Sequence, residues 1–165
     1  MTPRRIIIHH TAGNSLPNPN PYHFVVDFDG RVHTGIPVTQ TTGATRNNNE
    51  GSIMIAALGN WVTENMSTTQ QNGLVNAIAN TLNRFPSIVR QNRFNLPASQ
   101  MHHLGQLSRQ ELPVAQRRHQ NSGIKGHEDG LGEATLCPGA RLYNLCRDTL
   151  VIRAINLANS RPNLQ

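Results

Sequence analysis

The chain alternates short apolar runs with polar loops. Five runs have the length and the β-branched or alternating composition of strands, and they cover residues 4–8, 22–27, 31–35, 52–58 and 124–127. The first run ends in three consecutive isoleucines and the fourth is almost continuously apolar, which is typical of strands that are buried on both faces. Asp29-Gly30 is a turn dipeptide, so the second and third runs are predicted to form a hairpin.

Helical periodicity begins after the fourth run. Ser67 is a predicted N-cap, and Gln70, three residues later, is its expected capping-box partner. Apolar residues then recur every three or four positions until Pro86, which ends the pattern. Pro138 is predicted to open a final helix, because proline is favoured in the first helical turn.

Strands and helices in this order predict one α/β domain over residues 1–165, with a mixed central sheet of about five strands flanked by two to three helices. The length suits a single domain. Residues 87–123 are rich in arginine and histidine and are hard to assign to helices or strands, with one helix expected near 108–119. Residues 160–165 are expected to form a frayed tail.

The net charge of the chain indicates a class of binding partner. Lysine and arginine number 15 against nine acidic residues, a net charge of +6, and Lys125 is the only lysine. Such a balance favours an anionic partner: nucleic acid, a membrane surface, or an acidic polymer such as a cell wall. No run approaches the roughly 20 apolar residues of a membrane span. The first residues lack the apolar region of a signal peptide, so synthesis in the cytoplasm is expected.

Three side chains with metal-binding chemistry stand where strands end or helices begin. His9 closes the first strand, His127 closes the last, and Cys137 follows ten residues later beside Pro138. Imidazole and thiolate are the usual zinc donors, and three protein ligands with one open position are the catalytic arrangement. Eight histidines and two cysteines offer many such triplets, so spacing alone does not select this one.

Four blocks in a fixed order make the assignment specific. The chain resembles the zinc-dependent N-acetylmuramoyl-L-alanine amidases (amidase type 2), a family that includes amidase-type phage endolysins and the animal peptidoglycan recognition proteins. The blocks are IIIHHTAG at 6–13, YHF at 22–24 leading to Asp29-Gly30, GSI to GN over 51–60, and GHED followed by TLCPG over 126–139.

The resemblance implies a role for each matching position. His9, His127 and Cys137 would hold one Zn²⁺ at the floor of a groove, in the fold of the peptidoglycan recognition proteins. Tyr22 matches a tyrosine whose hydroxyl lies near the metal, and Thr135 matches a position that holds lysine or threonine. The implied reaction is hydrolysis of the amide bond between N-acetylmuramic acid and L-alanine, with Tyr22 and Thr135 as catalytic residues.

Two further residues are candidates for substrate contact. His10 follows the first ligand, and Trp61 either lines the groove or covers a strand end. Two departures from the family concern the groove wall: only 13 residues separate His9 from Tyr22, and Ala44 stands where many relatives have a histidine. Residues 87–123 form an insertion without a family counterpart. Cys146 is expected in the core.

These expectations combine into one function with two competitors. The chain is expected to be a monomeric phage endolysin that degrades peptidoglycan, made without a signal peptide and acting on the cell wall after release. The arginines could contact an anionic envelope surface, although an ordinary solvated surface is the alternative. A non-catalytic peptidoglycan-binding module and a cytoplasmic muropeptide-recycling amidase are the competing functions. Nucleic acid is not an expected partner, because no binding motif or basic helix is present.

Overall fold

A computed structural model describes residues 1–45, 48–94, 122–127 and 135–161, and the statements of structure below concern these residues. Five strands form one sheet in the order β3-β2-β4-β1-β5. β1 pairs in parallel with β4 and β5, β2 pairs in parallel with β4, and only β2 and β3 are antiparallel. The predicted mixed sheet and hairpin are confirmed. The strands are Arg5–His10 (β1), Phe24–Val26 (β2), Val32–Thr34 (β3), Ser52–Ala57 (β4) and Gly123–Gly126 (β5).

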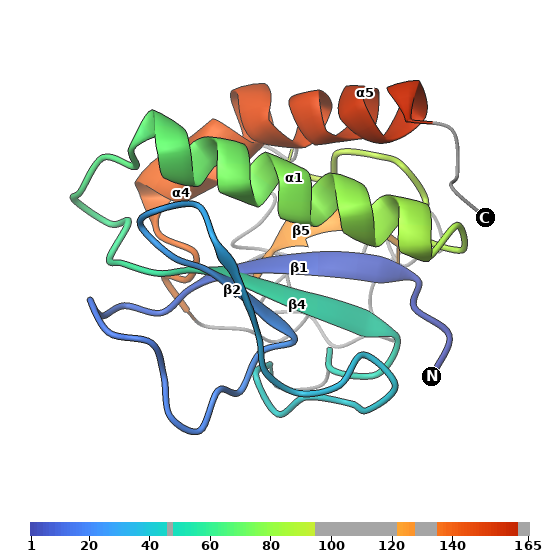
Figure 1. The fold of residues 1–165 in the computed structure, drawn as a ribbon, viewed down its shortest axis with the longest axis horizontal. Coiled ribbons are helices and arrows are strands. Elements are labelled where there is room, and N and C mark those ends of the chain that lie inside the picture. Colours follow the sequence, from blue (N-terminus) through green and yellow to red (C-terminus); the bar gives the residue numbers. More distant parts are fainter. Residues whose placement is uncertain (46–47, 95–121, 128–134, 162–165) are drawn as a thin grey trace, which may run out of the picture.

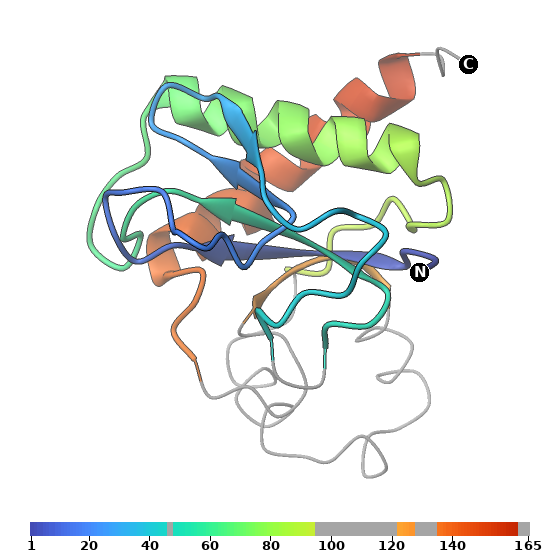
Figure 2. The same cartoon turned by 60° about the horizontal axis from the view of Figure 1, so that its bottom comes forward.

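The helices form a layer on one side of this sheet. α1 spans Thr68–Arg84, and α4 (Ala140–Leu145) continues through one π-helical turn, Cys146–Leu150, into α5 (Val151–Ser160). α1 and α5 lie side by side above the sheet, and loops occupy its other side (Figures 1 and 2). Among the described helices, none combines the length and apolar composition that a bilayer crossing needs. The helix expected near 108–119 lies outside the described residues.

The core lies between the sheet and the helices. Ile6 and Ile8 of β1 and Ile53 and Ile55 of β4 belong to one buried cluster with the apolar face of α1. The alternate residues of β1 and β4 are also buried, among them Ile7 and Met54. Burial on both faces explains the consecutive apolar residues Ile6 to Ile8 in β1 and Ile53 to Ala57 in β4.

A buried arginine ties the first residues of β1 to β4. Arg5 is 2% exposed, and its Nε donates to the Ser52 hydroxyl at 2.5 Å. Its Nη2 donates to the carbonyl oxygens of Asn48 and Glu50, both at 3.0 Å. These neutral oxygens offset the cost of removing the guanidinium from water. The contacts also fix Arg5 opposite Ser52, which sets the register of the whole strand pair.

The start of α1 departs from the expected capping box. Ser67 is the N-cap, and its hydroxyl accepts from the backbone N–H of Gln70 at 3.2 Å, as predicted. The Gln70 side chain does not return to Ser67. It is fully buried, and its Nε2 donates to the carbonyl oxygens of Leu58 at 2.8 Å and Val26 at 3.1 Å. These carbonyls follow β4 and end β2, so the buried amide joins α1 to the sheet instead.

The final helix begins two residues later than predicted. Ala140, not Pro138, is its first residue, and Gly139 is the N-cap with a φ of +90°. A side chain at Gly139 would place its Cβ 2.5 Å from the backbone carbonyl carbon of Trp61. Glycine is required here by both the positive φ and the close approach, and the turn it makes delays the helix.

The contact between α1 and the β2–β3 turn predicts the cost of one methyl group. A Cβ at Gly73 would lie 2.5 Å from the Cα of Gly30, whose own φ of +76° suits glycine. In Gly73→Ala we expect overpacking to cost about 1–3 kcal/mol. Alanine gains about 1 kcal/mol in helix propensity at an open site, so the net loss of stability should reach about 2 kcal/mol. Denaturant unfolding measures the difference.

Gly43→Ala is the matched control, since a Cβ at Gly43 meets no atom within 4 Å. Its free energy of unfolding should stay within about 1 kcal/mol of the parent. Equal destabilisation by both changes would contradict the proposed packing constraint between Gly73 and Gly30.

Candidate metal centre

The structure brings His9, His127 and Cys137 together. One ligand atom from each residue lies within 4.8 Å of the others. The strand pairing explains the meeting of the two histidines: Ile8 is opposite Gly126, so the next residue of each chain segment, His9 or His127, lies at the same level. Their ring centroids are 4.5 Å apart. Cys137 reaches the pair from the turn before α4.

His9 is held by sulfur atoms at both ring nitrogens. Its Nδ1 lies 3.6 Å from the Cys137 Sγ, and its Nε2 lies 3.3 Å from the Met54 Sδ. A thioether sulfur accepts hydrogen bonds and cannot donate them, so the contact to Met54 favours a proton on Nε2. The lone pair of Nδ1 then faces Cys137, which is the side where a metal would bind.

Burial keeps His9 neutral. The side chain is 1% exposed, and its pKa is well below the usual value because burial penalises the charged ring, with a smaller contribution from His127 and His10. The pKa of the half-buried His10 is lowered by the same two causes, burial first and then His127. A metal ligand must present an unprotonated imidazole nitrogen, and this environment supplies one near neutral pH.

The backbone around Cys137 favours a thiolate. The Sγ accepts from the backbone N–H of His10 at 3.3 Å, which offsets part of the cost of charging a thiol in a residue that is only 8% exposed. A hydrogen bond from a backbone amide stabilises the charged form of sulfur. The backbone N–H of Cys137 donates to the hydroxyl of Thr135 at 3.1 Å, which holds the turn that carries the thiol.

The donor set fits zinc. Zinc bonds of about 2.0–2.3 Å in tetrahedral geometry place nitrogen and sulfur donors about 3.3–3.6 Å apart. The distance of 3.6 Å between His9 Nδ1 and Cys137 Sγ agrees with that geometry. Two imidazoles and a thiolate are ligands that suit zinc, whereas calcium and magnesium prefer oxygen.

Tyr22 lies against this cluster. Its ring centroid is 5.0 Å from that of His9, and its hydroxyl donates to the carbonyl oxygen of His10 at 3.4 Å. Burial, followed by the negative charge of Cys137, raises the pKa of Tyr22 to about 12. The hydroxyl is therefore protonated near neutral pH and can donate a hydrogen bond to a developing negative charge.

The predicted substrate residues differ in their surroundings. His10 is partly exposed at the end of β1, and its Nδ1 accepts from the backbone N–H of Trp61 at 3.4 Å. Trp61 is 2% exposed and packs in the core, with its ring edge-on to Phe28 at a centroid distance of 6.4 Å. This burial favours the second interpretation of Trp61, an aromatic side chain that covers a strand end. Contact of either residue with substrate stays a prediction.

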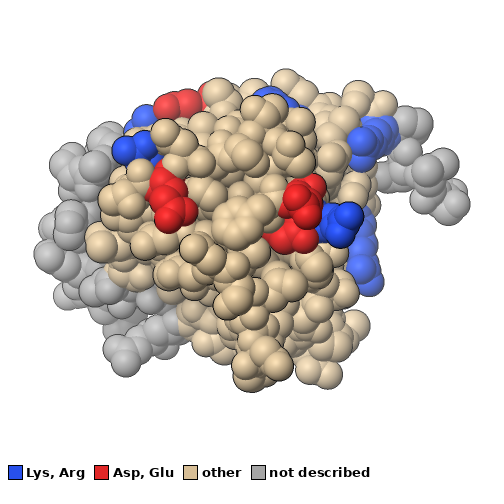
Figure 3. Space-filling view, turned by 60° about the vertical axis from the view of Figure 1, so that its left-hand side comes forward, with Lys and Arg blue, Asp and Glu red and all other residues tan. Residues whose placement is uncertain are grey.

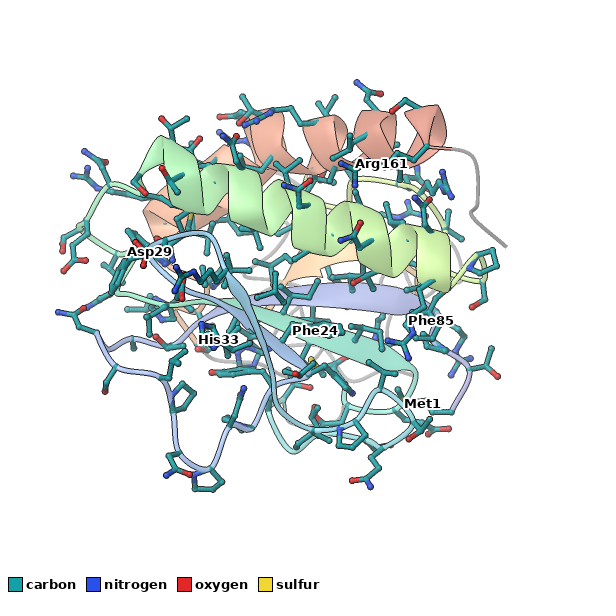
Figure 4. The ribbon with its side chains drawn as sticks, viewed as in Figure 1. Met1, Phe24, Asp29, His33, Phe85 and Arg161 are labelled. Carbon is teal, nitrogen blue, oxygen red and sulfur yellow. The ribbon has the colours of Figure 1, made fainter. Side chains whose placement is uncertain are left out.

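Other chemistry-bearing residues have structural roles. His23 is buried, accepts at Nδ1 from the backbone N–H of Met54 at 2.9 Å, and donates from Nε2 to the Gln40 carbonyl oxygen at 3.1 Å. His33, which is labelled in Figure 4, pairs with Asp27 at 2.7 Å. Cys146 is fully buried in the core, as predicted. Residues outside the described part of the chain include His102, His103, His119, Glu128 and Asp129.

Sequence reasoning missed Met54. Its signal was strand alternation: Met54 is opposite Ile7 in the parallel pair, two residues before the position opposite His9. Ile7 and His9 are on the same face of β1, so Met54 belongs to that face too. The pairing of β1 with β4 was not known from the sequence, and a methionine in an apolar strand indicates only a core residue.

Comparison with known proteins places this geometry in a family. The family described as N-acetylmuramoyl-L-alanine amidase matches residues 1–140. A comparison with curated protein sequences finds no match.

Similar solved structures show the same fold at low sequence identity. The amidase LysC from Clostridium intestinale is 19% identical, with 86% of this chain and 79% of that chain covered and a TM-score of 0.60. Peptidoglycan recognition protein SD of Drosophila is 19% identical, with coverage of 90% and 82% and a TM-score of 0.64. An endolysin of a Thermus scotoductus bacteriophage is 17% identical, with coverage of 89% and 86% and a TM-score of 0.59. Since the family match extends over residues 1–140 of the 165, this chain belongs to the N-acetylmuramoyl-L-alanine amidase family.

Proposed function

We propose that this chain is a zinc-dependent amidase that hydrolyses the bond between N-acetylmuramic acid and L-alanine in bacterial peptidoglycan. The observation that carries the proposal is the cluster of ligand atoms from His9, His127 and Cys137, all within 4.8 Å of one another. The family match supports the reaction. The bacteriophage endolysin among the similar structures supports the further proposal that the protein is an endolysin, acting on the cell wall after release.

In this proposal residues 1–165 form one amidase domain. The family match ends at residue 140, and α5 follows it. α5 packs along α1, and its residues Val151, Ala154 and Ala158 belong to the same buried cluster as the sheet. The last helix therefore contributes to the core of the domain that carries the site.

His9, His127 and Cys137 would hold one zinc ion. Bound zinc lowers the pKa of water and polarises a carbonyl group, which is the chemistry that amide hydrolysis needs near neutral pH. The neutral His9 and the thiolate-favouring surroundings of Cys137 prepare both residues as ligands before the ion binds. Met54 contacts the remaining nitrogen of His9 and so acts as a positioning residue.

Tyr22 and Thr135 would stabilise the negative charge that develops on the scissile carbonyl oxygen. The Tyr22 hydroxyl keeps its proton, because its pKa is raised to about 12, and it lies on the cluster side of β1. Thr135 accepts from the backbone N–H of Cys137 through its oxygen, which leaves its own proton for a second hydrogen bond. His10 would contact the substrate beside the metal.

The reaction is tested by the bond that is cut. Peptidoglycan incubated with the protein should release new N-terminal L-alanine, and a chelator should stop the release until zinc is restored. The Cys137→Ala variant should bind no zinc by elemental analysis and release no alanine, because a ligand is gone. New reducing sugar ends would identify a glycosidase and contradict the proposal.

Cys146→Ala is the matched control for Cys137→Ala. Cys146 is also buried but lies in the core, so its variant should keep zinc and amidase activity despite a stability loss of about 1 kcal/mol. Loss of zinc from both variants would mean that unfolding, and not removal of a ligand, explains the first result.

The proton on Tyr22 predicts a large catalytic effect from a small change. Tyr22→Phe removes the hydroxyl and keeps the ring beside His9, so zinc content should be unchanged. Removal of one hydrogen-bond donor to a developing oxyanion should lower kcat by about 100- to 1,000-fold. Steady-state kinetics on a soluble muropeptide measure this effect, and full activity of the variant would exclude Tyr22 from catalysis.

The contact of His9 with Met54 predicts an effect on metal affinity. Met54→Leu keeps the apolar volume and removes the sulfur acceptor, so the Nε2–H tautomer of His9 loses its partner. We expect zinc affinity to fall by about tenfold, at the low end for groups that orient metal ligands, because sulfur is a weak acceptor. Competition titration with a zinc-binding dye measures the affinity. Met66→Leu, at another buried methionine in the main core cluster, should leave it unchanged; an equal fall in both variants would contradict the assignment.

A further inference from the structure

Helix α1 carries a stripe of asparagines on the side that faces α5. The spacing of four, four and three residues places the stripe on one helix face. Three of its members are exposed and the last is partly exposed. The stripe consists of Asn72, Asn76, Asn80 and Asn83.

Each asparagine of the stripe accepts a hydrogen bond from an arginine outside α1. Arg153 of α5 donates to the Oδ1 of Asn72 at 2.7 Å. Arg161, just after α5, donates through its two terminal nitrogens to Asn80 at 3.3 Å and Asn76 at 3.4 Å.

Arg90 completes the set at the other end of α1. It donates to Asn83 at 3.0 Å and also to Asn159 of α5. Arg90, Arg153 and Arg161 are called the arginine row below. With a rise of about 1.5 Å per residue, the 11 steps from Asn72 to Asn83 make the asparagine stripe, and the row that bonds to it, about 16.5 Å long.

The two helices that the arginine row and its asparagine partners join contain no acidic residue. Residues 65–110 and 149–165 contain no aspartate or glutamate, so neither α1 nor α5 carries a carboxylate. Figure 3 shows acidic side chains with Lys and Arg side chains near some of them, and Figure 4 places Asp29 at the opposite end of α1 from Arg161. Arg147 offers the contrast: it pairs with Asp148 at 2.7 Å, which cancels its charge.

Asparagine partners orient these arginines without neutralising them. A guanidinium has five N–H donors, and the asparagine bonds of Arg90 and Arg161 each engage two terminal nitrogens, so further donors stay available. Guanidinium groups bind phosphate through paired hydrogen bonds, and fixing the side chain in advance lowers the entropy lost on binding. A row of such groups suits a polymer that presents one phosphate after another.

We propose that the arginine row binds an anionic phosphodiester polymer of the bacterial cell wall. The row lies on the helix layer, whereas His9 is on the opposite face of β1 from Ile8, which packs with α1, so the metal centre uses the side of the sheet that faces away from the helices. The protein can therefore hold the wall polymer while its metal centre meets peptidoglycan. The choice of a cell-wall polymer rests on the proposed amidase function. The observation of the charged surface does not depend on that function.

Nucleic acid fits this surface less well. Binding of single strands combines backbone contacts with exposed aromatic rings on which bases stack. The two aromatic residues that flank Arg90 in sequence are not free for stacking: Phe94 is fully buried, and Phe85 packs against the core and lies under the guanidinium of Arg84 at 5.3 Å. Among the described residues, the row thus offers phosphate contacts without a stacking platform.

The test compares two triple variants of equal charge. The row variant carries Arg90→Gln, Arg153→Gln and Arg161→Gln, and the control variant carries Arg4→Gln, Arg31→Gln and Arg147→Gln. Binding to poly(glycerol phosphate) is titrated for the parent and both variants over 50–200 mM salt. The row variant should bind at least about tenfold more weakly at 50 mM salt, and its salt slope should fall by about 2, since each phosphate contact adds about 0.7.

The control variant should bind within about threefold of the parent, because it removes the same charge elsewhere. Equal weakening in both triple variants would show a response to net charge and overturn the proposal. Tighter binding of single-stranded DNA than of the polymer, with the same dependence on the row, would assign the surface to nucleic acid and overturn it too.

Two further measurements separate docking from folding and from catalysis. The Arg–Asn bonds also join α5 to α1, so the melting temperature of each variant is recorded. If the glutamine variant unfolds, a second variant with Arg153→Lys and Arg161→Lys is used, because it keeps the positive charge. The lysine variant should retain most of the salt slope; loss of binding despite intact folding would contradict the role of charge. Cleavage of a soluble muropeptide by the row variant should equal the parent's. Polymer binding without any amide cleavage would contradict the amidase function alone.

Discussion

Parallel pairing of β1 with both β4 and β5 is the constraint on which the rest of the structure depends. It places His9 and His127 at the same level on neighbouring strands, and it places Met54 on the face of the sheet that carries His9. The register is held at the start of β1 by the buried guanidinium of Arg5, which bonds to Ser52 and two carbonyl oxygens. A shift of one residue would turn His9 to the helix side and disperse the cluster.

The three proposed ligands come from segments that are distant in sequence but close in the sheet. The turn that carries Cys137 is shaped by Gly139, whose φ of +90° and contact with the Trp61 backbone exclude any other residue. The backbone N–H of Trp61 also donates a hydrogen bond to the Nδ1 of His10. The site is thus supported by backbone geometry on each side, which favours a preformed set of ligands over one assembled by the metal.

Much of the fold could be predicted from the sequence, because its elements are marked by local signals. Strand composition, the Asp29-Gly30 turn and the Ser67 cap all act over a few residues, and each corresponds to an observed element. Errors arose where a distant partner decided the outcome. Gln70 bonds to carbonyls of the sheet instead of Ser67, and the last helix starts after Pro138 because Trp61 occupies the space beside Gly139. Met54 was missed for the same reason, because local sequence patterns do not predict which strands pair in the sheet.

The central claim is that His9, His127 and Cys137 together bind one zinc ion. Zinc K-edge X-ray absorption of the purified protein tests it most directly, because the spectrum reports which atoms surround the metal. The account predicts one sulfur at about 2.3 Å and two imidazole nitrogens at about 2.0–2.1 Å in the parent and in Cys146→Ala, and no zinc signal from Cys137→Ala. A zinc environment made only of oxygen and nitrogen in the parent protein would contradict it.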